Sequence, residues 1–299
     1  ARLGLKTKLI QTRPGRFTKS KIPEFIEIEL KNNSIGNTSI HAVSSSDKRS
    51  DKIQITESIQ PIYDQATKIA LTDGITTLIK GQSGTGKENL ARFIHDQSIR
   101  KDKSYITINC SAIGDQLLES RLFGYKKGAF TDAKDDRPGL FKDADEGTIF
   151  LDEIGDIIPY MQQSLLRVIQ EDVIMPVGGK EQKINVRIIA ATHQNLIEKC
   201  KKGEFRWDLY YRLSIVELTL PSLVERGQKD IKAMLKFLLK KKKKDLNKSK
   251  VLKLSKDAEK IIVDYTYPGN IREMENIITK LYVFNEEQVE KTDLPIEIN

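Results

Sequence analysis

One glycine-rich segment constrains the fold of this chain more than any other part of its sequence. It has the spacing G-x-x-x-x-G-K and consists of Gly81, Gln82, Ser83, Gly84, Thr85, Gly86, Lys87 and Glu88. The apolar residues 76–80 before it predict a buried strand, and the pattern of residues 88–97 after it predicts a helix. A strand, a glycine-rich turn and a helix in this order are typical of an α/β domain with parallel strands.

The following residues continue this alternation of strands and helices. Residues 105–109, 148–152 and 186–192 are apolar enough for buried strands, and helical periods run over residues 58–70 and about 161–171. We therefore predict an α/β fold with a mostly parallel sheet flanked by helices.

The two ends of the chain differ from this central part. Residues 25–30 nearly alternate apolar and acidic side chains, which predicts a strand, and a polar linker follows over residues 44–51. Beyond about residue 228 only helical patterns remain, and the last is a long helix over residues 271–284. The predicted organisation is an unassigned N-terminal segment and linker (1–52), an α/β domain (53–228) and a smaller C-terminal helical domain (229–299).

The composition argues against several classes of protein. Hydrophobic residues make up 38% of the chain and charged residues 31%, as expected of a globular protein. The apolar runs are too short to cross a bilayer, so no membrane partner is expected. Two cysteines are too few for a disulfide framework, which favours a reducing cytoplasm. The net charge of +8 favours anionic partners only weakly, because the lysine run at residues 240–244 is more simply a solvated helix end.

The glycine-rich segment predicts a site for a nucleotide polyphosphate. Its glycines allow main-chain N–H groups to turn towards phosphate oxygens, and the N-terminus of the following helix adds positive charge. Lys87 is placed to reach the terminal phosphates of ATP. Glu88 stands where the motif usually has a serine or threonine that contacts Mg²⁺, so this cation would depend on phosphates, water and another carboxylate.

Asp152 and Glu153 are the candidates for that carboxylate, because they follow directly on an apolar strand. Together they look like a Walker B element, in which Asp152 holds Mg²⁺ and Glu153 orients and polarises the attacking water. Two acids at the end of a strand are often only solvated. Their spacing from Lys87 favours a metal ligand at Asp152 and a catalytic residue at Glu153.

Longer motifs make the chain resemble a known family. The matching segments are residues 81–88, 122–124, 127–131, 147–155, 177–179, 186–196, 205–213 and 267–273. With them, the stretch from about residue 58 to residue 295 resembles the central domain of the NtrC family of bacterial enhancer-binding activators, within the AAA+ superfamily. The resemblance implies a P-loop AAA+ domain with a C-terminal helical lid domain, ATP and Mg²⁺ as ligands, and hydrolysis of ATP to ADP and phosphate.

The resemblance also implies roles for single residues outside the glycine-rich segment. Asn109 corresponds to the asparagine that interacts with the catalytic glutamate, and Thr192 corresponds to the sensor I residue. Arg272 corresponds to sensor II, which reaches from the lid towards the phosphates. Arg206 and Arg212 correspond to arginine fingers that act on the nucleotide of a neighbouring subunit, which implies a ring oligomer such as a hexamer.

A loop over residues 128–133 corresponds to the segment that contacts sigma-54 in this family. Phe130 and Thr131 would make that contact. The family has glycine at the position of Asp132, so this chain carries a negative charge and less backbone freedom there. A second departure is Val224, where the family usually has arginine.

These features favour an ATPase that remodels the closed complex of the sigma-54 RNA polymerase holoenzyme in the cytoplasm, as part of a two-component system. DNA would be bound through a domain absent from this chain. Asp132 keeps open an alternative, an AAA+ ATPase that remodels a different protein target. A third reading is a regulatory nucleotide-binding module without turnover. His193, beside Thr192, is expected to be structural and is assigned no chemistry.

Overall fold

The computed structural model describes residues 42–43, 54–112 and 114–298. The strand predicted over residues 25–30 and the polar linker over residues 44–51 lie outside the described residues. Among those that are described, no helix is both long and apolar enough to cross a membrane. Short 3-10 turns in this described part are Cys110–Ala112, Ile154–Asp156, Lys291–Asp293 and Ile296–Ile298.

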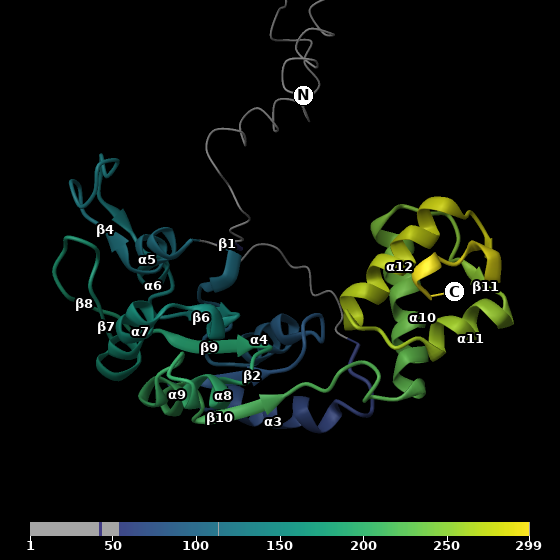
Figure 1. Ribbon diagram of the computed structural model, residues 1–299, viewed down its shortest axis with the longest axis horizontal. Coiled ribbons are helices and arrows are strands. Elements are labelled where there is room, and N and C mark those ends of the chain that lie inside the picture. Colours follow the sequence, from purple (N-terminus) through teal and green to yellow (C-terminus); the bar gives the residue numbers. More distant parts are fainter. Residues whose placement is uncertain (1–41, 44–53, 113, 299) are drawn as a thin grey trace, which may run out of the picture. The chain divides into compact units, whose positions relative to one another are not determined.

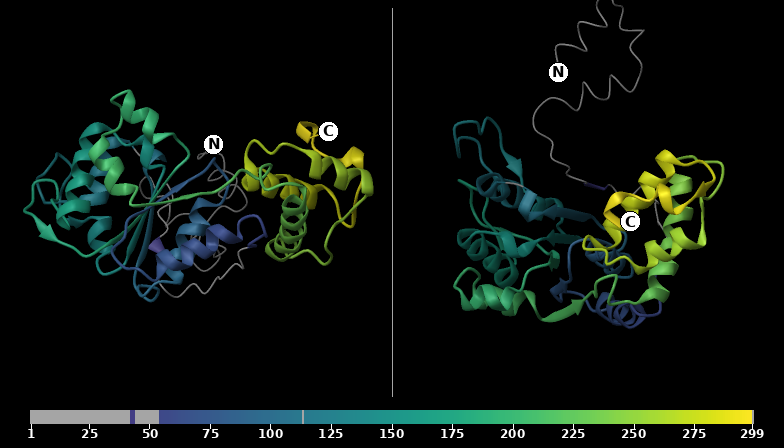
Figure 2. Two further views of the ribbon diagram at one scale, coloured as in Figure 1. Left: turned by 90° about the horizontal axis from the view of Figure 1, so that it is seen from below. Right: turned by 45° about the vertical axis from the view of Figure 1, so that its right-hand side comes forward.

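A six-stranded sheet forms the centre of the α/β part (Figures 1 and 2). Its strands, in spatial order, are β1 (Ala42–Val43), β3 (Tyr105–Asn109), β6 (Thr148–Asp152), β9 (Arg187–Thr192), β2 (Thr77–Lys80) and β10 (Val216–Thr219). Neighbouring strands run parallel except β1 and β3, which are antiparallel. The predicted mostly parallel sheet is therefore confirmed.

Helices cover both faces of this sheet, as predicted. One face packs against α3 (Gln60–Ala70) and α4 (Lys87–Asp96). The other face packs against the helices α5 (Asp115–Phe123), α6 (Leu140–Asp143), α7 (Pro159–Glu171), α8 (Leu196–Lys201) and α9 (Trp207–Leu213). A mostly parallel sheet needs such cover because each of its faces is apolar.

The inner strands contribute alternate residues to two separate cores. In β6, Phe150 packs with α3 and α4, whereas Ile149 and Leu151 pack with the helices on the opposite face. In β9, Ile189 and Ile188 are divided between the two cores in the same way. Strands buried on both faces require continuous apolar runs. These runs made β3 and β6 predictable to the residue.

Two short antiparallel ladders lie beside the sheet's larger helical layer. One joins β4 (Gly124–Tyr125) to β5 (Arg137–Pro138), and the other joins β7 (Val173–Ile174) to β8 (Gln182–Lys183). A bridge between Tyr125 and Val177 connects the two. Gly124 has a φ of 83°, and a Cβ there would lie 2.5 Å from the carbonyl oxygen of Arg137, so only glycine fits.

The C-terminal part has a hydrophobic core of its own. Its helices are α10 (Gln228–Asp245), α11 (Lys256–Asp264) and α12 (Asn270–Phe284), which pack through residues such as Leu235, Ile262 and Ile278. The expectation of helices alone beyond residue 228 is wrong, because β11 (Lys253–Leu254) pairs in parallel with β12 (Gln288–Val289). Strands of this length arise from tertiary pairing and leave no period in the sequence.

Candidate functional site

The carboxyl ends of the parallel strands bring the predicted site residues to one edge of the sheet. Asn109, the last residue of β3, is in register with Asp152, the last residue of β6. Thr192, which ends β9, is in register with Lys80 of β2, and its carbonyl oxygen accepts a hydrogen bond of 3.2 Å from the amide of Gly81. The glycine-rich segment therefore begins beside the acidic strand ends. Ligands of open α/β sheets bind at this edge.

The glycine-rich segment has a backbone shape that side chains would prevent. Gly84 and Gly86 have φ angles of 76° and 101°, in the left-handed region. A Cβ on Gly84 would lie 2.3 Å from the carbonyl oxygen of Gly269, so this position also requires glycine for close approach. Within the described part of the chain, the amides of Gly84 and Gly86 donate to no protein acceptor. The segment thus offers free N–H groups, which suit the oxygens of a phosphate.

Lys87 is the first residue of α4 and its side chain is buried. Its Nζ donates to the carbonyl oxygens of Gly81, at 3.0 Å, and Gln82, at 3.4 Å. The same nitrogen lies 3.4 Å from Oε1 of Glu153. The ammonium group is therefore held over the glycine-rich loop and beside the acid that follows β6.

The two acids at the end of β6 have different electrostatic surroundings. Burial raises the pKa of Asp152, and the neighbouring Glu153 carboxylate raises it further. Burial alone would also raise the pKa of Glu153, but the hydrogen bond from His193 and the charge of Lys87 outweigh it and lower that pKa. Glu153 also has a φ of 54°, an uncommon conformation for a residue with a side chain. It is consequently an ionised carboxylate held in a strained position.

His193 makes the contact with Glu153 that the sequence did not suggest. Its Nδ1 lies 2.6 Å from Oε2 of Glu153, and its main-chain amide donates to the same oxygen at 3.2 Å. The expectation that His193 is only structural therefore misses a direct partner of the candidate catalytic acid. The signal available in the sequence was its position directly after Thr192 at the end of a strand.

Asn109 and Thr192 are near the acids but have other partners. Oδ1 of Asn109 accepts hydrogen bonds from the amide and the hydroxyl of Ser111, at 2.9 Å and 2.8 Å. The contact between Asn109 and Glu153 implied by the family resemblance is absent from this structure, in which Lys87 and His193 hold the acid instead. Oγ1 of Thr192 is buried and accepts from the amide of Gln194 at 3.0 Å.

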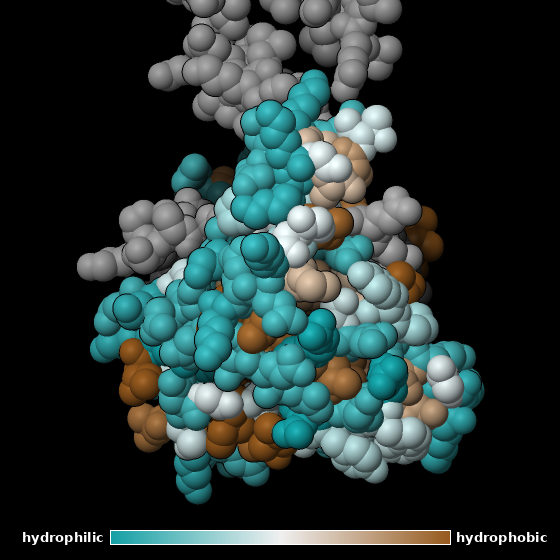
Figure 3. Space-filling model, turned by 90° about the vertical axis from the view of Figure 1, so that its left-hand side faces the viewer, coloured by the Kyte–Doolittle hydropathy of each residue, from teal (hydrophilic) through white to brown (hydrophobic). Residues whose placement is uncertain are grey.

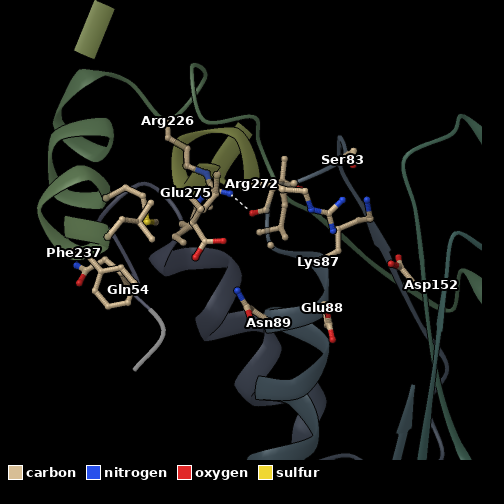
Figure 4. Close-up of a pocket in the computed structure, with 18 of the residues that line it drawn as sticks. Gln54, Ser83, Lys87, Glu88, Asn89, Asp152, Arg226, Phe237, Arg272 and Glu275 are labelled. Atoms are coloured by element: carbon tan, nitrogen blue, oxygen red, sulfur yellow. Dashed lines mark hydrogen bonds between the residues drawn. The ribbon is translucent and has the colours of Figure 1, made fainter. Parts of the chain in front are cut away.

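The glycine-rich loop and the acids line a cavity of about 330 Å³ together with residues of α10 and α12 (Figure 4), whereas Thr192 and His193 do not line it. Asp152, Glu153, Asn109 and Lys87 border its polar end. Seven apolar residues also line the cavity: Ile59, Tyr63, Leu220, Met234, Phe237, Leu238 and Ile271. The glycine-rich loop and the charged side chains of Arg226, Lys241, Arg272 and Glu275 form much of the rest. Free amides in the same cavity as a group of apolar side chains match a ligand that has phosphates at one end and a flat base at the other.

The three predicted arginines fall in two places. Arg272, in the first turn of α12, lines the cavity. Arg206 and Arg212 belong to the segment of α9 and do not line it. The guanidinium group of Arg206 donates two hydrogen bonds to the carboxylate of Asp208. Arg212 is exposed and has no ion-pair partner among the residues that the structure describes.

Sequence reasoning also missed Arg226 and Asn270, which reach the glycine-rich loop from the C-terminal side. Nη2 of Arg226 donates to the carbonyl oxygen of Thr85 at 2.7 Å, and Nδ2 of Asn270 donates to that of Ser83 at 3.0 Å. Both side chains are buried. The sequence signal for Asn270 was its place after the turn at Pro268 and Gly269; Arg226 had none beyond its proximity to Val224.

The loop between β4 and β5 carries Phe130 and Thr131 away from the cavity. Phe130 is 44% exposed, and its ring meets that of Tyr125 edge to face at 4.8 Å between centroids. Gly128, with a φ of 81°, donates to the carbonyl oxygen of Ala133 at 2.8 Å and so closes the loop. Figure 3 faces this end of the α/β part, whose surface is mainly hydrophilic with scattered hydrophobic residues.

The donors in the cavity can be compared with the needs of Mg²⁺. The described residues contain no group of three or more His, Cys, Asp or Glu side chains that could hold a metal ion. Asp152 offers one carboxylate, and Glu88 is exposed on the first turn of α4. A single carboxylate fits Mg²⁺, which commonly uses one or two protein oxygens and completes its shell with phosphates and water.

Comparison with known families gives matches to both parts of the chain. Residues 53–219 match the sigma-54 interaction domain, and residues 225–299 match an AAA+ ATPase lid domain.

Individual relatives agree with these matches. The transcriptional regulatory protein ZraR of Salmonella typhimurium is 44% identical over 242 residues, which covers 80% of this chain and 54% of the relative. The transcriptional regulatory protein GlrR of Escherichia coli strain K12 is 47% identical over 218 residues, which covers 73% of this chain and 48% of the relative. This chain therefore spans about half the length of the curated relatives it matches.

Solved structures give the same result. NtrX from Brucella abortus superimposes with a TM-score of 0.75 at 31% identity, covering 82% of this chain and 56% of that one. The structure of the same protein in complex with ATP gives a TM-score of 0.74 at 32% identity and covers 83% of this chain and 57% of that one. From the family matches and these relatives, we conclude that the chain belongs to the sigma-54 interaction domain family and continues into an AAA+ ATPase lid domain.

Proposed function

We propose that this chain is an ATP-hydrolysing transcription activator domain that remodels the closed complex of the sigma-54 RNA polymerase holoenzyme. The observation that carries the proposal is a cavity in which free loop amides, Lys87 and Glu153 meet, in a member of the sigma-54 interaction domain family. The domain boundaries proposed with it are residues 53–228 for the ATPase domain and 229–299 for the lid.

In this proposal the polar end of the cavity binds the phosphates of ATP. The amides of Gly84 and Gly86 point to phosphate oxygens, and Lys87 exchanges its carbonyl partners for the terminal phosphates. Arg272 adds a positive charge from α12. The binding of ATP and ADP by the Brucella abortus protein NtrX supports this assignment.

Asp152 is the proposed ligand of Mg²⁺, with phosphate oxygens and water as its other ligands. When bound, Mg²⁺ neutralises charge on the phosphates. The raised pKa of Asp152 reflects its burial beside Glu153, and a cation there would favour the ionised form of both acids.

Glu153 is the proposed general base. It accepts a proton from water as the water oxygen attacks the γ-phosphorus, and the bond from that phosphorus to the bridging oxygen of ADP breaks. The lowered pKa of Glu153 keeps it ionised and ready to accept hydrogen bonds from water. Asn109 lies in register with Asp152, at the same edge of the sheet as Glu153. We propose that its side chain leaves Ser111 and binds Glu153.

Arg206 and Arg212 are proposed to act on the nucleotide of a neighbouring subunit in a ring, with a hexamer as the expected assembly. Their position outside the cavity of their own chain supports this role. Arg206 must then leave Asp208, an exposed partner that contributes little to stability. Thr192 ends β9, and its carbonyl oxygen accepts a hydrogen bond from Gly81 at the start of the glycine-rich loop; we propose that it transmits the loss of the γ-phosphate to the sheet.

Phe130 and Thr131 are the proposed contacts with sigma-54. Phe130 is partly exposed on this loop, so its ring is accessible to a partner. Because RNA polymerase acts in the cytoplasm, the proposal locates the chain there. Control by a two-component system and DNA binding through a further domain belong to the same proposal.

A trapping experiment tests the proposed partner. The chain is incubated with ADP, aluminium fluoride and purified sigma-54, and complexes are separated by native electrophoresis. We expect sigma-54 to be retained by the wild-type chain and lost with Phe130→Ala, while a primary sigma factor is not retained. Intact ATP hydrolysis without retention of sigma-54 would contradict the proposal and favour an ATPase that acts on another protein.

We expect His193→Ala to lower ATP turnover by roughly tenfold to a hundredfold, because Glu153 loses the imidazole partner that helps to orient it and keeps only the main-chain amide of residue 193 as a donor to its Oε2. Nucleotide affinity should stay within about twofold, since His193 does not contact the glycine-rich loop. His193→Asn, whose amide can still donate to Glu153, should recover part of the rate. Steady-state hydrolysis and fluorescent-nucleotide titration would measure both quantities; unchanged turnover in His193→Ala would refute the role.

We expect Arg212→Ala to reduce turnover by roughly 10³-fold when the protein is assembled, because a finger in trans stabilises charge in the transition state. Binding of ADP by the isolated chain should be unaffected, since Arg212 lies outside its own cavity. Sedimentation and hydrolysis assays at high protein concentration would test this. If the variant assembles and hydrolyses ATP like the wild type, Arg212 is not a finger.

A further inference from the structure

Three successive carbonyl groups of the glycine-rich loop are held by donors from the C-terminal side of the chain. The carbonyl oxygen of Ser83 accepts from Nδ2 of Asn270 at 3.0 Å, and that of Gly84 accepts from the amide of Ile271 at 3.0 Å. The carbonyl oxygen of Thr85 accepts from Nη2 of Arg226 at 2.7 Å. Each donor is remote in sequence from the loop it holds.

Holding these carbonyls fixes the direction of the loop's amides. A peptide unit is planar and trans, so the C=O of one residue points away from the N–H of the next. The carbonyls of Ser83 and Thr85 are drawn towards the C-terminal part of the chain. The amides of Gly84 and Gly86 therefore face the opposite way and remain free, as a phosphate site requires.

Asn270 is the central member of this arrangement. It is fully buried, it has a φ of 53°, and it begins α12. Its Oδ1 accepts from the amide of Leu223 at 2.8 Å, and its Nδ2 also lies 3.2 Å from Oε1 of Gln82. A buried, left-handed residue persists only where the surroundings determine its conformation. One amide group thus links the glycine-rich loop, the segment after β10 and α12.

We propose that Asn270 is a positioning residue for the phosphate-binding loop, through which the lid sets the affinity of the site for polyphosphates. This inference rests on the proposed function. Asn270 is not among the residues that line the cavity, so it acts through the loop backbone. Because the coupling is reciprocal, a bound nucleotide also stabilises the contact between the loop and α12.

The test compares Asn270→Gly with Asn247→Gly in the whole chain. Glycine accepts the left-handed conformation, so Asn270→Gly removes the amide group without backbone strain. Asn247 has a similar φ of 51° but is exposed in the lid and does not line the cavity, which makes it a matched control. Affinities for ADP and AMP are measured by titration, and the unfolding temperature is measured without nucleotide.

We expect Asn270→Gly to weaken ADP binding at least tenfold and AMP binding less than twofold, because AMP lacks the β-phosphate that the loop holds. Asn247→Gly should match the wild type for both ligands. A merely structural role for Asn270 predicts a lower unfolding temperature with equal losses for ADP and AMP, and that result would overturn the proposal. Wild-type affinity for ADP in folded Asn270→Gly would do the same.

Two further measurements cover the case in which Asn270→Gly does not fold. Asn270→Asp keeps the acceptor for Leu223 but presents an oxygen to the carbonyl of Ser83, and it should also weaken ADP binding at least tenfold. In the wild type, ADP should slow hydrogen exchange at the amide of Ile271; unchanged exchange would contradict the coupling. If the wild type binds no ADP at all, the proposed function fails first.

Discussion

Replacing Lys87 by methionine is expected to weaken ATP binding by at least about a hundredfold and to abolish measurable hydrolysis. The ammonium group of Lys87 lies at the polar end of the cavity and donates directly to carbonyl oxygens of the loop. Charge-assisted hydrogen bonds to phosphate are about twice as strong as neutral ones. Methionine retains most of the buried volume, so the loss should come from charge and not from packing.

Lys199→Met is a matched control for this variant. Nζ of Lys199 also donates to a main-chain carbonyl, that of Gly155, at 2.6 Å, but Lys199 does not line the cavity. Its replacement should leave ATP affinity within about twofold. Titration with a fluorescent ATP analogue compares both variants with the wild type, and near-wild-type affinity of Lys87→Met would show that the phosphates bind elsewhere.

Replacing Glu153 by glutamine is expected to lower the rate of ATP hydrolysis by about 10²–10⁴-fold while ATP affinity is kept. Glutamine has the same shape and can accept the hydrogen bonds from His193, but its amide cannot take a proton from water. The contact with Lys87 loses its charge, which leaves the ammonium group freer to pair with phosphate. The variant should therefore separate binding from turnover.

Glu146→Gln controls for the backbone conformation of Glu153. Glu146 has a comparable φ of 63°, but it does not line the cavity. Its variant should hydrolyse ATP at the wild-type rate. Single-turnover measurements exclude effects of product release. A rate for Glu153→Gln within tenfold of the wild type would remove Glu153 from the chemistry and favour a nucleotide-binding module with little turnover.

The sequence predicted the parts of this fold that depend on local pattern. β3 and β6 begin and end at the predicted residues because both faces of each strand are buried, which leaves continuous apolar runs. The glycine-rich loop was predictable because its spacing reflects backbone angles that only glycine adopts easily. The acids Asp152 and Glu153 were predictable from their position at the end of a strand.

Contacts between distant segments were not predictable in this way. The pairing of β11 with β12 joins segments far apart in the chain, and both strands are too short to show the alternation of apolar and polar residues that marks a strand. The contact of His193 with Glu153 depends on the adjacent ends of β6 and β9, which only the assembled sheet provides. Asn270 reaches Ser83 only after the lid has folded against the loop. A single sequence carries no direct signal for such side-chain partners.

Every proposed role depends on one polyphosphate site, and calorimetric titration of the wild-type chain with ATP and Mg²⁺ shows whether that site exists. We expect saturable binding in the micromolar range, with one nucleotide per chain, that is lost in Lys87→Met and kept in Lys199→Met. No detectable heat of binding at millimolar ATP, from folded protein, would contradict this expectation.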